Sequence, residues 1–173
     1  MQSEELVVLV DNNNNPIGTA EKDTVHTTDT PLHRAFSLFI FNSHNQVLLT
    51  KRASSKKTFP GVWTNTVCGH LAPEETPVAA ATRRLQEELG ISGIQLQNIG
   101  STHAQDTGEK FKRRHMFRVY VCKAVPVKLQ KDEVKSVFWS NPKDLYEDMQ
   151  VNSEKYTGGF KNTIKLFLSQ TVQ

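Results

Sequence analysis

Short apolar runs separated by polar turns predict a sheet of buried strands in this chain. Each run is rich in β-branched or aromatic residues and is bounded by Asn, Gly, Pro or Ser, as buried strands usually are. The cluster DNNNNPIG at 11–18 predicts a turn, and NSHN at 42–45 predicts the turn of a hairpin. The expected strands lie at 6–10, 36–41, 46–50, 63–67, 93–105, 115–125 and 134–140.

Three segments carry helix signals instead. Thr76 is a capping residue, Pro77 suits the first helical position, and Gly90 suits the end of a helix that spans 77–89. A shorter helix is expected at 141–149 and an amphipathic helix at 160–170. Mixed strands with a central and a terminal helix predict an α/β/α sandwich or a related α+β fold.

Length and composition describe an ordinary globular chain. It has 173 residues and a net charge of +3 from 21 basic and 18 acidic side chains, which is too mild to indicate nucleic acid as a partner. The apolar run at its start is too short for a signal peptide or a membrane span, so no membrane partner is expected. Two widely spaced cysteines suit a reducing compartment, and we therefore expect a cytoplasmic protein.

The central helix carries charges of both signs at helical spacing. Arg84 and Glu88 are four positions apart, as are Arg83 and Glu87. Glu87 and Glu88 offer oxygen ligands for a hard cation such as Mg²⁺, and the arginines suit phosphate oxygens. The plainer interpretation is a surface helix with ordinary Arg–Glu pairs, each worth a few tenths of a kcal/mol.

The spacing of residues from Gly69 to Ile91, in GHLAPEETPVAAATRRLQEELGI, resembles the signature of the Nudix family of diphosphate-processing enzymes. The resemblance implies a Nudix-type α/β/α sandwich with a mixed sheet, and we expect one Nudix domain over residues 1–173. Arg84 departs from the pattern, because Nudix hydrolases usually carry glutamate there. An arginine neither ligates a cation nor acts as a base at neutral pH.

A closer resemblance runs from about residue 16 to residue 91. EKDTVHTTDTPLHRAFSLFIFN, KRASSKKTFPGVWTNTVCGH and the doubled arginine resemble the type I isopentenyl-diphosphate isomerases, a branch of the Nudix fold. The resemblance implies Cys68 as the catalytic thiol and a metal held by His26, His33 and His70. It also implies Mg²⁺ near Glu88, with Glu87 beside it. The basic residues that it assigns to the diphosphate are Lys22, Arg52, Lys56 and Arg84.

The resemblance weakens in the second half of the chain. Where the family has two glutamates separated by one residue, RRHMFRVYV places Arg113 and His115, so His115 becomes a possible fourth metal ligand. Where the family has a tryptophan that faces the substrate cation, KYTGGF places Gly158 or Gly159, and the nearest aromatic residues are Tyr156 and Phe160. A larger gap there would admit a group bulkier than a five-carbon alkene.

Three functions are therefore compared. The first is an isomerase that interconverts isopentenyl and dimethylallyl diphosphate, with Mg²⁺ and a second divalent cation, Zn²⁺ or Mn²⁺, at the histidines. The second is a Nudix hydrolase of nucleoside or prenyl diphosphates, and the third is a diphosphate-binding protein without turnover. The plainer interpretation of each residue stays open: a packed histidine, a small buried Cys68, a surface cation. The sequence indicates no oligomeric state.

Overall fold

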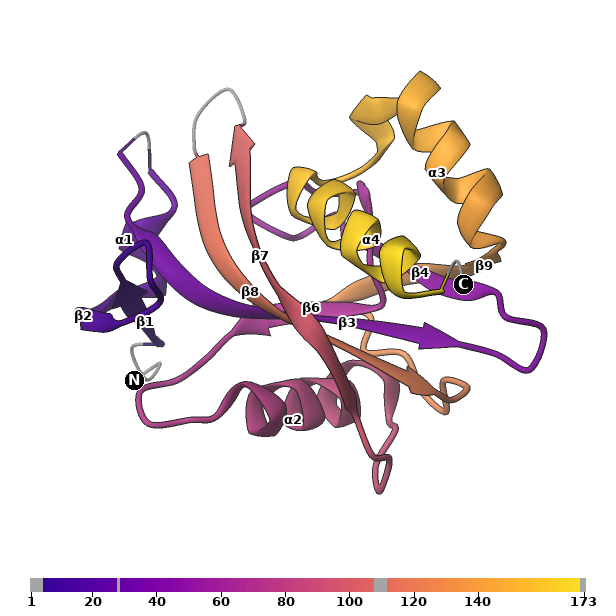
Figure 1. Cartoon of the computed structure of the whole chain (residues 1–173), viewed down its shortest axis with the longest axis horizontal. Helices are drawn as coiled ribbons and strands as arrows, with labels where there is room; N and C mark the ends of the chain where they lie inside the picture. Colours follow the sequence, from indigo (N-terminus) through magenta and orange to yellow (C-terminus); the bar gives the residue numbers. More distant parts are fainter. Residues whose placement is uncertain (1–4, 28, 108–111, 172–173) are drawn as a thin grey trace.

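The computed structural model describes residues 5–27, 29–107 and 112–171, and in this part of the chain nine strands form one mixed sheet with helices on both faces (Figure 1). The strands are β1 (Leu6–Val10), β2 (Pro16–Glu21), β3 (Leu32–Phe41), β4 (Val47–Arg52), β5 (Trp63–Thr64), β6 (Val67–His70), β7 (Gln97–Thr107), β8 (Lys112–Lys123) and β9 (Val134–Ser140). The helices are α1 (Lys22–Val25), α2 (Pro77–Leu89), α3 (Pro142–Val151) and α4 (Gly158–Thr171), with a 3₁₀ turn η1 (Ser153–Lys155) before α4.

Strand β3 is the centre of the sheet. Strand β8 pairs with it in parallel along its whole length, from Leu32 opposite Arg114 to Phe41 opposite Lys123. Three other strands pair with β3 in the antiparallel sense: β1 near its start, β6 in its middle and β4 at its end. The strands that carry the histidines and Cys68 are therefore placed by their register on β3, and β9 joins the sheet through β4.

Alternate residues of β3 enter two separate hydrophobic layers. Phe36, Leu38 and Ile40 pack with Leu85 and Leu89 of α2 on one face of the sheet. On the opposite face, Ala35 and Phe39 pack with residues of α4, among them Phe160, Ile164 and Phe167. Figure 1 shows α2 on one side of the sheet and α3 with α4 on the other. This two-sided burial confirms the α/β/α sandwich that the sequence predicts.

The predicted helix at 77–89 is confirmed together with both of its ends. The hydroxyl of Thr76 accepts a hydrogen bond from the backbone N–H of Ala79 at 3.3 Å. Gly90 adopts φ 68°, and its N–H donates to the carbonyl oxygen of Gln86. The short helix also begins as expected, because the side chain of Asn141 accepts from the N–H of Lys143.

Several strand boundaries differ from the prediction. Pro16 to Gly18 belong to β2 rather than to a turn, since this segment pairs with β1. The stretch predicted as one strand at 63–67 is interrupted at Asn65 and Thr66, whose side chains bond to backbone atoms of β3 and β4. No helix in the described ranges is both long and apolar enough to span a membrane.

Replacing Thr76 by alanine should destabilise the protein by about 1 kcal/mol, the usual cost of losing a helix N-cap. The loss is expected in the free energy of unfolding measured by urea denaturation. Ser169→Ala, which changes an exposed hydroxyl near the end of α4, is the control and should have a smaller effect. An equal loss in both variants would contradict a specific role for the cap.

Candidate active site

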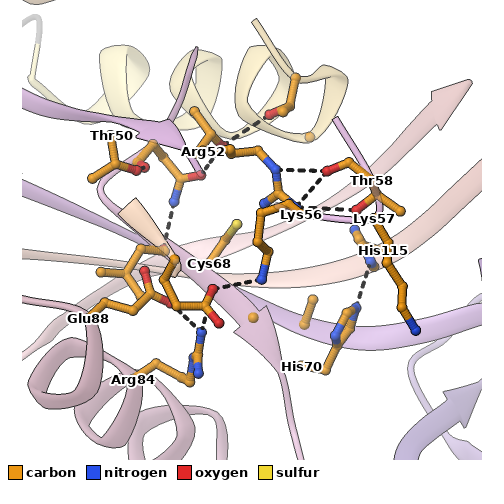
Figure 2. A pocket seen from close by; sticks show the side chains of 18 of the residues that line it. Thr50, Arg52, Lys56, Lys57, Thr58, Cys68, His70, Arg84, Glu88 and His115 are labelled. Carbon is orange, nitrogen blue, oxygen red and sulfur yellow. Dashed lines mark hydrogen bonds and ion pairs between the residues drawn. The ribbon is translucent and has the colours of Figure 1, made fainter. Parts of the chain in front are cut away.

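A cavity of about 910 Å³ opens beside β6 and collects most of the residues that the sequence singles out. Cys68 and His70 come from β6, His115 from β8, and Arg84 and Glu88 from α2 (Figure 2). The basic side chains come from α1, the end of β4 and the loop that follows β4. The cavity thus combines one thiol, several imidazoles and a charged group of side chains.

The register of the sheet explains why these residues meet. His33 lies opposite His115 in the parallel β3–β8 pair, and Ala35 lies opposite His70 in the β3–β6 pair. Residues two positions apart in a strand share a face, so His33 and Ala35 point to the same side of the sheet. Cys68 precedes His70 by two positions and shares that face too. Three imidazoles and the thiol are therefore fixed by strand pairing.

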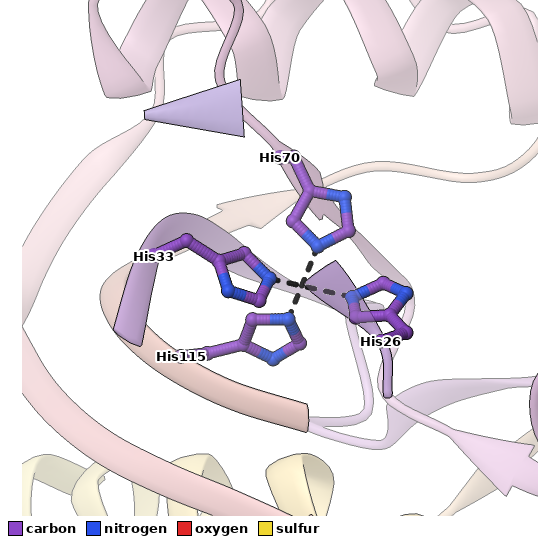
Figure 3. A group of neighbouring side chains, drawn as sticks. All are labelled: His26, His33, His70 and His115. Atoms are coloured by element: carbon purple, nitrogen blue, oxygen red, sulfur yellow. Dashed lines mark hydrogen bonds between the residues drawn. The ribbon is translucent and has the colours of Figure 1, made fainter. Parts of the chain in front are cut away.

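Four imidazoles converge at one point (Figure 3). His26, which follows α1, joins His33, His70 and His115, and one ligand nitrogen from each lies within 4.8 Å of all the others. The Nε2 atoms of His26 and His33 are 3.3 Å apart, and those of His70 and His115 are 3.1 Å apart. His33 and His115 are buried, and the other two are half-buried.

This spacing fits a metal ion. Nitrogen ligands about 2.0–2.1 Å from a tetrahedral ion lie about 3.4 Å from each other, close to the two distances observed. The Nδ1 atom of His33 lies 2.9 Å from the carbonyl oxygen of Pro31, and donation to that oxygen directs the Nε2 lone pair into the cluster. Four neutral imidazoles are typical ligands of a divalent transition metal.

The two cysteines have different surroundings. Cys68 is not part of a disulfide and is half-buried at the cavity wall, on the face of the sheet that α4 covers. Cys122 is also not part of a disulfide, but it lies in the hydrophobic layer beneath α2, where burial raises the pKa of its thiol to about 11. Only Cys68 is placed to meet a molecule in the cavity.

The basic side chains at the cavity are already paired with acceptors. Lys22 binds Glu5 at 2.8 Å, and Lys56 binds Glu133 at 2.7 Å. Arg52 donates from Nε and Nη2 to the backbone oxygen of Thr58 at 3.1 and 2.8 Å, and so it clamps the loop that carries Lys56. These contacts keep the cations at the cavity and give each a partner that an anionic ligand would have to replace or share.

Arg84 lies among three carboxylates. Its Nη1 donates to Glu87 at 2.9 Å, while its Nη2 lies 2.6 Å from Glu88 and 3.2 Å from Glu133. Burial lowers the pKa of Arg84, but the three negative charges outweigh it and hold that pKa above its ordinary value. Burial also raises the pKa of Glu88 to about 7, even though Arg84 opposes the shift. Arg84 thus stays charged, and Glu88 is the carboxylate of this group that takes up a proton most readily.

Comparison with known proteins agrees with this geometry. The model of the NUDIX domain matches residues 31–158. A Corynebacterium diphtheriae protein named isopentenyl-diphosphate Delta-isomerase is 43% identical over 152 residues, which cover 84% of this chain and 83% of that protein. The Corynebacterium glutamicum (ATCC 13032) protein of the same name is 45% identical over 154 residues, which cover 83% and 80%. The chain belongs to the Nudix family, in its isopentenyl-diphosphate Delta-isomerase branch.

Solved structures agree on the Nudix fold. A Deinococcus radiodurans crystal structure superposes with a TM-score of 0.75 over 93% of this chain and 98% of that one, at 19% identity. A NUDIX hydrolase from Alicyclobacillus acidocaldarius gives a TM-score of 0.59 over 79% and 90%, at 16% identity. At such low identity these neighbours show the fold alone.

The structure places nearly all of the predicted site residues at the cavity of the Nudix domain. The cavity lining includes the thiol, four predicted cations, three predicted histidines and one predicted carboxylate: Cys68, Lys22, Arg52, Lys56, Arg84, His26, His70, His115 and Glu88. His33 is buried within the imidazole cluster. Glu87 lies outside the lining, half-exposed on the Nudix helix α2, where it contacts Arg83 and Arg84.

From the second half of the chain, His115, Gly159 and Phe160 line the cavity as expected, and so does Phe117, which the sequence did not single out. On β8 the described side chains that line the cavity are His115 and Phe117, and the side chain of Arg113 lies outside the described residues. Gly159 and Phe160 line the cavity at the start of α4. Tyr156 instead donates a 2.5 Å hydrogen bond to Asp148 and lines a separate cleft beside α3.

Glu133 is a charged residue of the cavity that the sequence analysis did not single out. It lies at the cavity and contacts both Lys56 and Arg84, although it is far from either in the sequence. Its segment, KDEV, carries no motif and reads as the polar lead into a strand. Only the pairing of β9 with β4 brings it to this place.

Replacing His115 by alanine should weaken the binding of a divalent transition-metal ion at the imidazole cluster by more than about tenfold, because one of four ligands is lost. Titration of the metal-free protein with Zn²⁺ against a competing chelator measures the affinity. His44→Ala, in the exposed turn between β3 and β4, is the matched control and should leave the affinity unchanged. Equal affinity in all three proteins would refute a metal site here.

The raised pKa of Glu88 predicts a pH-dependent stability. In the unfolded chain Glu88 loses its proton above the ordinary carboxyl pKa, whereas in the folded protein it keeps the proton up to a pKa of about 7. The contribution of Glu88 to the free energy of unfolding therefore falls as the pH rises from the ordinary pKa toward about 7. Glu88→Gln mimics the protonated form. It should therefore gain stability relative to the unaltered protein between pH 5 and pH 8, by on the order of 2 kcal/mol in EDTA.

Urea denaturation at both pH values measures this difference for Glu88. Glu87→Gln is the control, because it removes the neighbouring, half-exposed carboxylate that also contacts Arg84. A stability difference for Glu88→Gln that is the same at pH 5 and pH 8 would show that burial does not perturb this carboxyl.

Proposed function

We propose that this chain is a metal-dependent isomerase that interconverts isopentenyl and dimethylallyl diphosphate, acting as one Nudix domain over residues 1–173 in the cytoplasm. One observation carries the proposal: the thiol of Cys68, the four-imidazole cluster and the cationic side chains line a single cavity. The names of the Corynebacterium relatives support the same activity. A hydrolase has no need of this thiol or of these imidazoles.

The charges of the cavity indicate how the substrate lies. Lys22, Lys56 and Arg84 would receive the diphosphate, since an arginine fork and two ammonium groups match its oxygens. Arg52 would act mainly by holding the loop of Lys56 in place. Glu88, with Glu87 close by, would hold Mg²⁺, which would supply positive charge to the diphosphate. Charge alone thus directs the polar end of the substrate to the α2 side of the cavity.

The hydrocarbon end would then lie near Cys68, Phe117 and Phe160, which line the cavity on the face of the sheet that α4 covers. Cys68 is the group that we assign to proton transfer with the alkene. For a protonation at C4, the thiol proton moves to carbon and leaves a thiolate and a cationic C3. Transfer of a proton from C2 to that thiolate then completes the shift of the double bond and restores the thiol. Burial beside aromatic side chains excludes water, which would otherwise capture a cationic intermediate.

Four imidazoles would hold the second divalent cation. Of the two ions considered, Zn²⁺ suits an all-nitrogen set better than Mn²⁺, which prefers carboxylate and water ligands. When bound, such an ion supplies positive charge and fixes the four side chains around it. The chain's own residues, above all Cys68, are left to move protons.

Strand β8 lacks the pair of carboxylates that the family resemblance implies, at the positions of Arg113 and His115. Where the family resemblance implies two carboxylates on one strand, the described residues of β8 at the cavity are an imidazole and a phenyl ring. Loss of one positioned proton-transfer group typically slows a reaction by about 10²–10⁴-fold. We therefore expect slow isomerisation. We also propose that the absence of a side chain at Gly159, which lines the cavity, admits a substrate bulkier than five carbons.

The hydrolase alternative gains little from the structure. Arg84 stands where Nudix hydrolases usually carry a glutamate, and an arginine neither holds a metal ion nor activates water. Binding without turnover is the other alternative, and the assay below separates it from isomerisation.

The test is incubation of the protein with isopentenyl diphosphate, Mg²⁺ and either Zn²⁺ or Mn²⁺, followed by NMR of the products. Dimethylallyl diphosphate should form, and Cys68→Ala should lower the rate by at least about 100-fold because it removes the proton-transfer group. Cys122→Ala is the matched control, since this thiol lies away from the cavity, and it should retain activity. Release of phosphate would favour the hydrolase, and saturable binding without product would favour a binding protein.

A further inference from the structure

Glu133 occupies the middle of the cationic group at the cavity. Its Oε2 atom lies 2.7 Å from Nζ of Lys56 and 3.2 Å from Nη2 of Arg84. The same Arg84 nitrogen lies 2.6 Å from Glu88. Glu133 therefore bridges two of the three cations that the proposed function assigns to the diphosphate, and it does so from a third element of the fold.

The backbone fixes this position. The carbonyl oxygen of Glu133 accepts from the N–H of Ala53, at the end of β4, and its own N–H donates to the carbonyl oxygen of Gln130. The N–H of Gln130 in turn donates to the carbonyl oxygen of Glu88 in α2. The turn before β9 is thus hydrogen-bonded both to the segment after β4, which carries Lys56, and to α2, which carries Arg84. The backbone therefore holds the Glu133 carboxylate close to these two cations.

Glu133 is charged in this setting. Partial burial by itself would raise the pKa of its carboxyl, but the hydrogen bond and charge of Lys56, with the charges of Arg84 and Lys22, hold that pKa below its usual value. The side chain remains 27% exposed, and Asp132 beside it also lines the cavity. The electrostatic partners of Glu133 are therefore the same cations that a diphosphate would seek.

We propose that Glu133 is a resident anion of the diphosphate subsite. Its carboxylate holds Lys56 and Arg84 together when no diphosphate is bound, and it competes with an incoming diphosphate for these two cations. The proposal rests on the proposed function only in assigning the diphosphate to these cations. Two like charges that share one pair of cations repel each other, so Glu133 weakens the binding of a diphosphate that carries no metal. A divalent cation bound to the diphosphate reduces that repulsion, and the subsite thereby selects the metal complex over the bare anion.

Calorimetric titration with inorganic pyrophosphate tests this role. In EDTA, Glu133→Gln should bind pyrophosphate about tenfold or more tightly than the unaltered protein, because the amide keeps the shape of the side chain and removes its charge. With saturating Mg²⁺ the difference should shrink to within about threefold. Damage to the fold would weaken binding, so a gain in affinity is not explained by a structural defect.

Asp132→Asn is the matched control, because it removes a neighbouring carboxylate of the same cavity that makes no ion pair described for this structure. Its affinity in EDTA should stay within about twofold of the unaltered protein. Equal or weaker binding by Glu133→Gln, or an equal gain in both variants, would overturn the role of Glu133. These outcomes leave the proposed function standing if isopentenyl diphosphate is still isomerised. Absence of pyrophosphate binding in every protein, with and without Mg²⁺, would overturn both.

Discussion

The parallel pairing of β3 with β8 is the constraint on which the site depends. It sets His33 beside His115, and the antiparallel pairing of β6 with β3 adds His70 opposite Ala35, two positions from His33. A slip of one residue in this register would turn the imidazoles of one strand to the opposite face of the sheet. Burial of Phe36, Leu38 and Ile40 under α2 resists such a slip, since each would have to leave the core. The hydrophobic core and the imidazole cluster therefore specify the same register.

The group of charges around Arg84 shows a different balance. Taking ions out of water costs free energy, and the attraction between them offsets this cost only where the geometry is close and each charge is matched. Here Glu88 is buried. The carboxylate of Glu133 lies 2.7 Å from Nζ of Lys56 and 3.2 Å from Nη2 of Arg84. Such a network adds little to the free energy of folding, and its main effect is to hold the cations at fixed positions. The helix, the loop after β4 and the turn before β9 are linked by it.

The cluster of four imidazoles would determine the charge of a metal ion bound there. Carboxylate ligands would cancel part of the charge of a divalent ion, whereas neutral imidazoles would leave all of it in place. Such an ion would bring positive charge to a cavity whose basic side chains Lys22, Lys56 and Arg84 are already paired with carboxylates. On the hydrocarbon side, Phe117 and Phe160 make the lining apolar. The cavity is therefore lined by paired charges of both signs at one part and by apolar side chains at another.

Interactions between residues close in sequence allowed much of the fold and of the candidate site to be predicted from the sequence. The cap at Thr76, the left-handed Gly90 and the periodic apolar stripe specify α2, and motif spacing carried the thiol, three histidines and the basic residues. Three features could not be predicted, because each depends on which strand lies alongside. They are the β2 strand, the break at Asn65 and Thr66, and the position of Phe117 at the cavity. Glu133 is the clearest case. The residues next to it in sequence give no sign of Lys56 or Arg84. The pairing of β9 with β4, together with the hydrogen bond from Gln130 to α2, brings the three charges into contact. Such long-range contacts depend on how the whole core packs.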